Sequence, residues 1–176
     1  DGNRRMLSVG RVSEVKNTLL LIDLISQIPE IELTMIGSYD SEEYFNLCAA
    51  KAKKSVAKIE FVGSISPAEL KGMRDSFGYM ITATSGENFG HAIIESLSHG
   101  TPVIISDQTP WNDLENFGAG WVIPLDQPER WKEVVSLALD LDDIVYQRMS
   151  ERAIAYVKSK IDVNEIRNQY LKLFSE

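Results

Sequence analysis

The sequence contains few side chains that could cross-link the chain or bind a metal ion. Its 176 residues include one cysteine and two histidines. The single cysteine, Cys48, cannot form an internal disulfide, and it lies in a predicted helix where we expect it to be buried. His91 and Glu95 are four positions apart, as in half of a zinc site. Because His99 is the only other histidine and no third ligand follows at metal spacing, we expect no metal site.

Other absences disfavour whole classes of protein. No apolar run approaches the ~20 residues that cross a bilayer, and residues 1–5 contain neither an initiator methionine nor the core of a signal peptide. We therefore expect a cytoplasmic protein and interpret the sequence as part of a longer chain. Its 18 basic and 26 acidic residues give a net charge of −8, whereas nucleic-acid-binding modules usually present a basic face, so we expect no nucleic-acid partner. Neither G-x-G-x-x-G nor G-x-x-x-x-G-K-S/T occurs, which argues against the standard dinucleotide fingerprint and against a Walker loop.

Short apolar segments alternate with helix-like segments along most of the chain. Strands are predicted at residues 6–10, 31–36, 59–62, 79–83, 102–106 and 120–124. Helices are predicted at residues 17–28, 42–53, from Ser66 onward, 90–98, 109–117, 128–141, 144–160 and 163–174. The connections are too long for hairpins and suit crossovers between parallel strands. The pattern predicts an α/β fold with a parallel sheet of about six strands, helices on both faces and further C-terminal helices.

Glycines and polar loops follow the predicted strands. Gly10, Gly37 and Gly63 each end a strand, and residues 84–90 and 106–110 follow the fourth and fifth strands. In open parallel sheets, ligands bind beyond the carboxyl ends of the strands, near the point where the strand order reverses. We therefore expect these loops to share one edge of the sheet and to bind a ligand there.

The segment 85–103 concentrates the candidate chemistry. Glu87 lies in a loop and Glu95 in a short apolar helix, with Gly90 at the helix start, where free N–H groups can bind an anion. A carboxylate among apolar residues needs a partner to offset its desolvation. The two hydroxyls of a ribose diol would supply one for Glu95, and a salt bridge or an exposed helix edge explains it equally well. Glu87 could accept sugar hydroxyls, or it could simply be solvated.

Two basic residues follow the first strand. Gly10 would let a phosphate approach the backbone, Arg11 offers a bidentate fork and Lys16 offers a point charge. The alternative is that both basic side chains are only solvated, as is common in loops. Trp111 either lines the same edge or packs on the sheet.

Taken in order, these residues resemble the carboxy-terminal, donor-binding domain of GT-B glycosyltransferases of family 4, the glycosyl transferases group 1. The E-x7-E motif is met by Glu87 and Glu95, and the resemblance covers residues 6–125. Asn17 departs from the pattern, because glycine often follows the lysine there. The residues that carry the resemblance are Val9-Gly10-Arg11-Val12-x3-Lys16-Asn17, Gly37, Phe61-Val62-Gly63 and Ser85-x-Glu87-x-Phe89-Gly90-x4-Glu95-x3-His99-Gly100-Thr101-Pro102-Val103.

The resemblance implies a Rossmann-like fold, half of a GT-B fold, and a nucleotide-diphosphate sugar as donor. It implies a retaining transfer that needs no metal and no cofactor. Arg11 and Lys16 would bind the diphosphate, Glu95 the ribose diol and Glu87 the donor sugar, so that Glu87, Arg11 and Lys16 are the expected catalytic residues. The remaining donor-binding residues would be Gly10, then Asn88, Phe89, Gly90 and His91 at the helix start, and Gly63 and Ile65 near the base.

The resemblance also implies that residues 1–176 form a single nucleotide-sugar-binding domain of a longer glycosyltransferase, without its amino-terminal acceptor domain. This chain alone would then bind donor without efficient transfer. The whole protein would serve polysaccharide or glycoconjugate synthesis and could associate peripherally with the inner face of a membrane, since acceptors in this family are often lipid-linked. Two alternatives remain: a GT-B-like nucleotide-sugar epimerase, and a non-catalytic α/β regulatory domain in which Glu87 and Glu95 make structural salt bridges.

Overall fold

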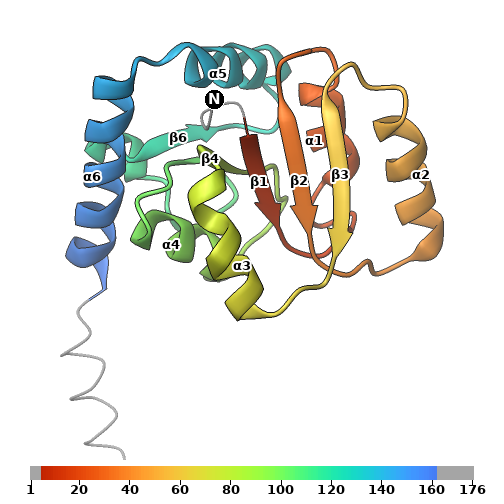
Figure 1. Ribbon diagram of the computed structural model, residues 1–176, viewed down its shortest axis with the longest axis horizontal. Coiled ribbons are helices and arrows are strands. Elements are labelled where there is room, and N and C mark those ends of the chain that lie inside the picture. Colours follow the sequence, from red (N-terminus) through yellow and green to blue (C-terminus); the bar gives the residue numbers. More distant parts are fainter. Residues whose placement is uncertain (1–4, 162–176) are drawn as a thin grey trace, which may run out of the picture.

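The computed structural model describes residues 5–161. Within them, six parallel strands form one sheet in the order β3-β2-β1-β4-β5-β6 (Figure 1). The predicted parallel α/β fold is thus confirmed, and every strand lies within one residue of its expected bounds. The strands are β1 (Arg5–Val9), β2 (Glu32–Ile36), β3 (Lys58–Gly63), β4 (Tyr79–Thr82), β5 (Val103–Ser106) and β6 (Gly120–Ile123).

Helices connect the strands much as predicted. The expected capping box is present at the start of α3, where the Ser66 hydroxyl accepts the Glu69 N–H at 3.2 Å and the Glu69 carboxylate accepts the Ser66 N–H at 2.7 Å. The helix predicted at 163–174 lies outside the described residues. The described α-helices are α1 (Thr18–Ile25), α2 (Glu42–Ala52), α3 (Pro67–Met73), α4 (His91–Ser98), α5 (Pro128–Asp140) and α6 (Asp143–Lys160).

The prediction of a helix at 109–117 is wrong in both its length and its type. Only the short 3-10 helix η3 (Leu114–Phe117) forms, and Gly118 ends it in the left-handed conformation as expected. The Thr109 hydroxyl accepts the Trp111 N–H at 3.3 Å. This local side-chain bond offers the backbone an alternative to helix at the position where the helix was expected to begin.

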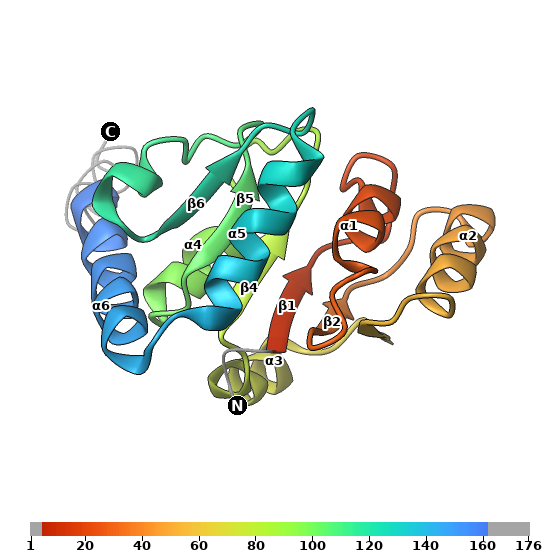
Figure 2. The ribbon, with the colours of Figure 1, turned by 90° about the horizontal axis from the view of Figure 1, so that it is seen from above.

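Two helical layers cover the sheet, as Figure 2 shows from above. Successive residues of β4 point to opposite faces: Tyr79 and Ile81 pack in the layer with α1, α2 and α5, and Met80 packs with α4 and α6. The helix α3 covers the second face near Leu7 of β1. Cys48 is fully buried in the first layer, as predicted. No helix within residues 5–161 combines the length and apolar composition needed to span a membrane.

The strand order places β1 beside both β2 and β4. The chain runs outward from β1 to β3, crosses back to β4 on the other side of β1, and then runs outward to β6. The loops after β1 and β4 therefore leave adjacent strands at the same carboxyl edge. This reversal of strand order is where open α/β sheets bind their ligands.

The loops after β1 and β2 touch backbone to backbone. Gly37 follows β2 with φ +149°, and a Cβ added there would lie 2.1 Å from the Gly10 carbonyl oxygen. Gly10 in turn donates its N–H to the Ile36 carbonyl at 2.9 Å. Any side chain at position 37 would therefore push the two loops apart.

We expect Gly37→Ala to lower the free energy of unfolding by about 2–4 kcal/mol, because it adds both a steric clash and an unfavourable φ. Urea unfolding followed by circular dichroism measures the change. The control is Gly72→Ala in α3, where a Cβ meets open space and should stabilise the helix by about 0.5–1 kcal/mol. Equal stability of the two variants would contradict the packing of the two loops.

Candidate functional site

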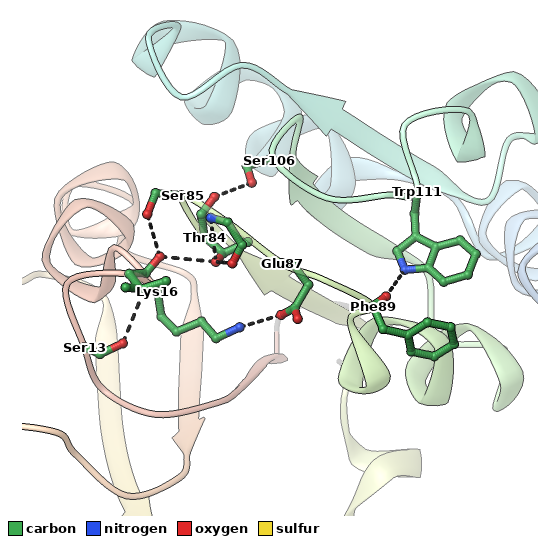
Figure 3. A network of polar contacts seen from close by, with 10 residues as sticks. Ser13, Lys16, Thr84, Ser85, Glu87, Phe89, Ser106 and Trp111 are labelled. Carbon is green, nitrogen blue, oxygen red and sulfur yellow. Dashed lines mark hydrogen bonds and ion pairs between the residues drawn. The ribbon is translucent and has the colours of Figure 1, made fainter.

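The loops after β1, β4 and β5 are joined by hydrogen bonds at the carboxyl edge (Figure 3). The Val15 carbonyl accepts the Ser85 N–H at 2.8 Å, the Ser85 hydroxyl at 3.0 Å and the Thr84 hydroxyl at 3.2 Å. The Ser106 hydroxyl at the end of β5 donates to the Thr84 carbonyl at 2.6 Å. These bonds fix the relative positions of the segments that carry Lys16 and Glu87.

Lys16 and Glu87 meet across the reversal point. The Lys16 Nζ lies 2.5 Å from Glu87 Oε2, and the two side chains are only 28% and 22% exposed. Desolvation of the Glu87 carboxyl raises its pKa, but the hydrogen bond and positive charge of Lys16, aided by the N–H groups of Gly90 and Asn88, outweigh it. The pKa of Glu87 therefore lies below the ordinary value of 4.5. The structure thus brings together two of the residues that the sequence placed at one site.

The backbone conformation of Asn17 explains why asparagine can stand where the family resembled often has glycine. Asn17 is the one non-glycine residue with positive φ in residues 5–161, at φ 48°, and it precedes the first turn of α1. Asparagine tolerates the left-handed region better than most residues. The substitution therefore keeps the backbone conformation that a glycine would provide.

The start of α4 is held by Trp111. Its Nε1–H donates to the Phe89 carbonyl at 2.5 Å, and its ring packs edge-on against Phe89 and Tyr156. Gly90 has φ +79°, and a Cβ there would meet the Trp111 Nε1 at 3.2 Å. Trp111 is 9% exposed. Of the two positions that the sequence allowed, at the edge or packed on the sheet, Trp111 therefore takes the packed one, directly beneath the loop. Phe89 itself is 41% exposed, and the ring of His91 lies 4.7 Å from its ring.

Glu95 lies at an exposed edge of α4. Its side chain is 54% exposed, and its Oε2 pairs with the Arg74 Nη2 at 2.5 Å. Glu95 is exposed because Ile93, Ile94 and Leu97 pack inward from the other side of α4. The sequence left a salt bridge and an exposed helix edge as alternatives to a bound ribose diol, and both of these features are present.

A hollow of about 390 Å³ brings Glu95 together with Arg11. Gly10, Gly37 and Ile65 from the ends of three strands line the same hollow. Gly63 instead lines an adjoining hollow of about 370 Å³, walled by Tyr39, Phe45 and Phe61. Of the predicted site residues, Gly10, Arg11, Ile65 and Glu95 thus line the first hollow and Gly63 the second, and the two hollows share Gly37, Ser38 and Ser64. Lys16, Glu87 and residues 88–91 line neither of these two hollows.

Arg11 is the most exposed of the candidate cations. Its Nη1 pairs with the Asp40 Oδ1 at 2.6 Å, and its side chain is 68% exposed. An exposed ion pair of this kind is worth little and exchanges partners easily. Arg11 is therefore free to turn toward an anion in the hollow.

Sequence reasoning missed two residues that organise the edge. Arg74 lies in the connection between α3 and β4, where no periodicity marks it. Asp40 is one acid among several near the start of α2. Residues 5–161 contain no group of three or more histidine, cysteine, aspartate or glutamate residues that could hold a metal ion. The imidazole of His99 contacts Arg74.

Comparison with known proteins gives one family. The family described as Glycosyl transferases group 1 matches residues 1–156. Phosphatidyl-myo-inositol mannosyltransferase of Mycobacterium tuberculosis is 23% identical over 181 residues, which is 97% of this chain and 47% of that protein. Alpha-monoglucosyldiacylglycerol synthase of Streptococcus pneumoniae is 28% identical over 128 residues, 68% of this chain and 28% of that protein. The chain spans about half the length of the first of these relatives, and less of the second.

Solved structures share the fold. HepE of Anabaena, in complex with UDP and glucose, superposes with a TM-score of 0.84 at 18% identity, over 99% of this chain and 49% of that one. WaaG, described as a glycosyltransferase involved in lipopolysaccharide biosynthesis, gives a TM-score of 0.78 at 17% identity, over 98% and 47%. The likeness concerns the fold of about half of each of these chains.

We expect Lys16→Met to lower the free energy of unfolding by about 1 kcal/mol at pH 7, since it removes a partly buried charged hydrogen bond. The folded pKa of Glu87 is lowered, so the pair contributes stability above pH 4.5 and loses it as the pH falls through the lower folded value. Urea unfolding at several pH values should show the two proteins converging in acid. Lys132→Met, which removes an exposed pair with Glu129, is the control, and a difference that does not depend on pH would contradict the assignment.

Trp111→Phe should loosen the start of α4. It removes the hydrogen bond to the Phe89 carbonyl and leaves a small void, which we expect to cost about 1–3 kcal/mol. Hydrogen exchange of the amides at 88–91 should become faster. The matched control is Trp131→Phe, which removes the analogous bond from Trp131 Nε1 to the Pro124 carbonyl at 3.0 Å. Equal acceleration of exchange at 88–91 in both variants would contradict the role of Trp111 in holding the start of α4.

Proposed function

The chain belongs to the family of glycosyl transferases group 1, and on that premise we propose that it binds a nucleotide-diphosphate sugar. In this proposal residues 1–176 are the single carboxy-terminal, donor-binding domain of a longer, GT-B glycosyltransferase of family 4. The observation that carries it is the shared carboxyl edge: Arg11 and Glu95 line one hollow, and Lys16 meets Glu87 beside it.

The diphosphate would lie between the loop after β1 and the start of α4. Lys16 has three N–H donors and commits one to Glu87, so others remain for a phosphate oxygen. Arg11 would exchange Asp40 for the anion, and Gly10 would let it approach the backbone. The positive end of α4, at Phe89 to His91, would add N–H donors and its dipole.

The nucleoside and the sugar would occupy the two sides of this anion. Glu95 would accept the ribose hydroxyls from the wall of the 390 Å³ hollow, with Ile65 lining the path to the base and Gly63 in the adjoining recess. Glu87 and Asn88 would face the donor sugar. The neighbouring Lys16 keeps the pKa of Glu87 below its ordinary value, so the carboxylate stays ionised and suits the acceptance of hydroxyl hydrogen bonds.

For the reaction itself we propose a retaining transfer without a metal ion or cofactor. The two cations and the helix amides would stabilise the negative charge that develops on the leaving diphosphate. The acceptor would bind to the rest of the whole protein. The names of the two curated relatives refer to phosphatidyl-myo-inositol and to diacylglycerol, which supports a lipid-linked acceptor, glycoconjugate or polysaccharide synthesis and a peripheral position at the inner face of a membrane.

One observation favours a second candidate, a non-catalytic regulatory domain. Both Glu87 and Glu95 form ion pairs within the chain, as that alternative requires. Its prediction is simple: no nucleoside diphosphate should bind.

Isothermal titration calorimetry with UDP and GDP tests both candidates. We expect one of the two to bind the wild-type chain, and Glu95→Ala to weaken it by at least about tenfold through loss of charged hydrogen bonds. Glu133→Ala, an exposed acid on α5 paired with Arg130, is the control. Absence of heat with every nucleoside diphosphate would favour the regulatory domain, and equal affinity of Glu95→Ala would remove the ribose role.

A further inference from the structure

A buried arginine lies directly behind Glu95. Arg74, in the 3-10 helix η2 (Arg74–Ser76), is 8% exposed. Its guanidinium holds Glu95 at two points, with Nη2 at 2.5 Å from the carboxylate Oε2 and Nη1 at 2.9 Å from the backbone carbonyl. The same Nη1 lies 2.8 Å from the His99 Nδ1. Arg74 therefore grips both the side chain of Glu95 and the turn of α4 that carries it.

The pair is asymmetric in its exposure. The side chain of Arg74 is 9% exposed, whereas that of Glu95 is 54% exposed and lines the hollow. The arginine reaches the carboxylate from the protein side and contacts Oε2, so the solvent side of the carboxylate stays accessible. A glutamate paired with an exposed lysine would not be constrained in this way, because both long side chains could move together.

Burying a guanidinium is costly unless its donors are satisfied. Here the Nε of Arg74 is buried without a hydrogen-bond partner among the described residues. A purely structural link between η2 and α4 could be made by an apolar side chain without that cost. The planar fork is instead suited to fixing the orientation of a carboxylate.

We propose that Arg74 is a positioning residue for the donor nucleotide, fixing the Glu95 carboxylate so that it faces the hollow and accepts the ribose 2′- and 3′-hydroxyls. The inference rests on the proposed function, because it assigns a ligand to Glu95. A free glutamate side chain loses rotamer freedom when it binds, and that loss weakens affinity. Arg74 removes the loss in advance by ordering the carboxylate before the ligand arrives.

The test compares nucleotides that differ only at the ribose. Calorimetry measures UDP, GDP and their 2′-deoxy counterparts against the wild type, Arg74→Met and Arg74→Lys. The wild type should prefer the ribonucleotide. We expect Arg74→Met to lower the affinity for the ribonucleotide by roughly 3- to 10-fold and the affinity for the 2′-deoxynucleotide by less. The ratio of the two affinities should therefore become smaller. Arg74→Lys keeps the charge without the fork, and it should lie between the wild type and Arg74→Met.

A double-mutant cycle separates positioning from general stability. In the Glu95→Ala background, Arg74→Met should have no further effect on affinity, because there is no carboxylate left to orient. Arg148→Met, an exposed arginine on α6, is the matched control and should leave every affinity unchanged. Thermal unfolding of each variant shows that it is folded, and Arg74→Lys carries the test if Arg74→Met does not fold.

The outcomes are distinguishable. If the wild type prefers the ribonucleotide and Arg74→Met or Arg74→Lys weakens both nucleotides equally, or weakens neither, Arg74 is not a positioning residue and the inference is overturned while the proposed function stands. If Glu95→Ala leaves the preference intact, the role of Glu95 fails and this inference fails with it. If the wild type binds none of the nucleotides, the proposed function itself is wrong.

Discussion

The carbonyl of Val15 and the three donors that converge on it determine how the edge of the sheet is arranged. They tie the loop after β1 to the loop after β4, and the strand order makes these two loops neighbours at the point of reversal. Lys16 follows Val15 directly, and Glu87 comes two residues after Ser85. The ion pair between them is therefore a consequence of backbone geometry, which also sets the distance between the proposed phosphate site and the proposed sugar site.

Each charge assigned to the ligand already has a partner within the chain. Arg11 pairs with Asp40, Lys16 with Glu87 and Arg74 with Glu95. These three pairs carry no net charge, although the whole chain carries −8. Binding of a diphosphate would be an exchange of partners, and the exposed Arg11–Asp40 pair exchanges at least cost. The less exposed Lys16–Glu87 pair would hold the loops in place while this happens.

The sequence predicted the parts of the molecule that depend on local pattern. Alternating apolar segments located the strands, and glycines after strands located the edge, because parallel strands end on one side. The spacing of α4 could also have decided between the alternatives left open for Glu95: Ile93, Ile94 and Leu97 form one face, and position 95 lies roughly opposite on a helix with 3.6 residues per turn. The partner Arg74 could not be predicted, since it lies in a connection without periodicity and meets Glu95 only through tertiary packing.

The openness of the edge separates binding from transfer. Arg11, Glu95 and Phe89 are all substantially exposed, so a donor bound against them would keep one side in water. Recognition of a diphosphate tolerates this, because charged hydrogen bonds at a partly exposed site still contribute affinity. Sugar transfer is more sensitive than binding to this exposure, because water competes with the acceptor for a reactive donor unless the site is closed. For the proposed function, the residues that select the donor can therefore all lie in this chain, while exclusion of water requires a second surface across the hollow.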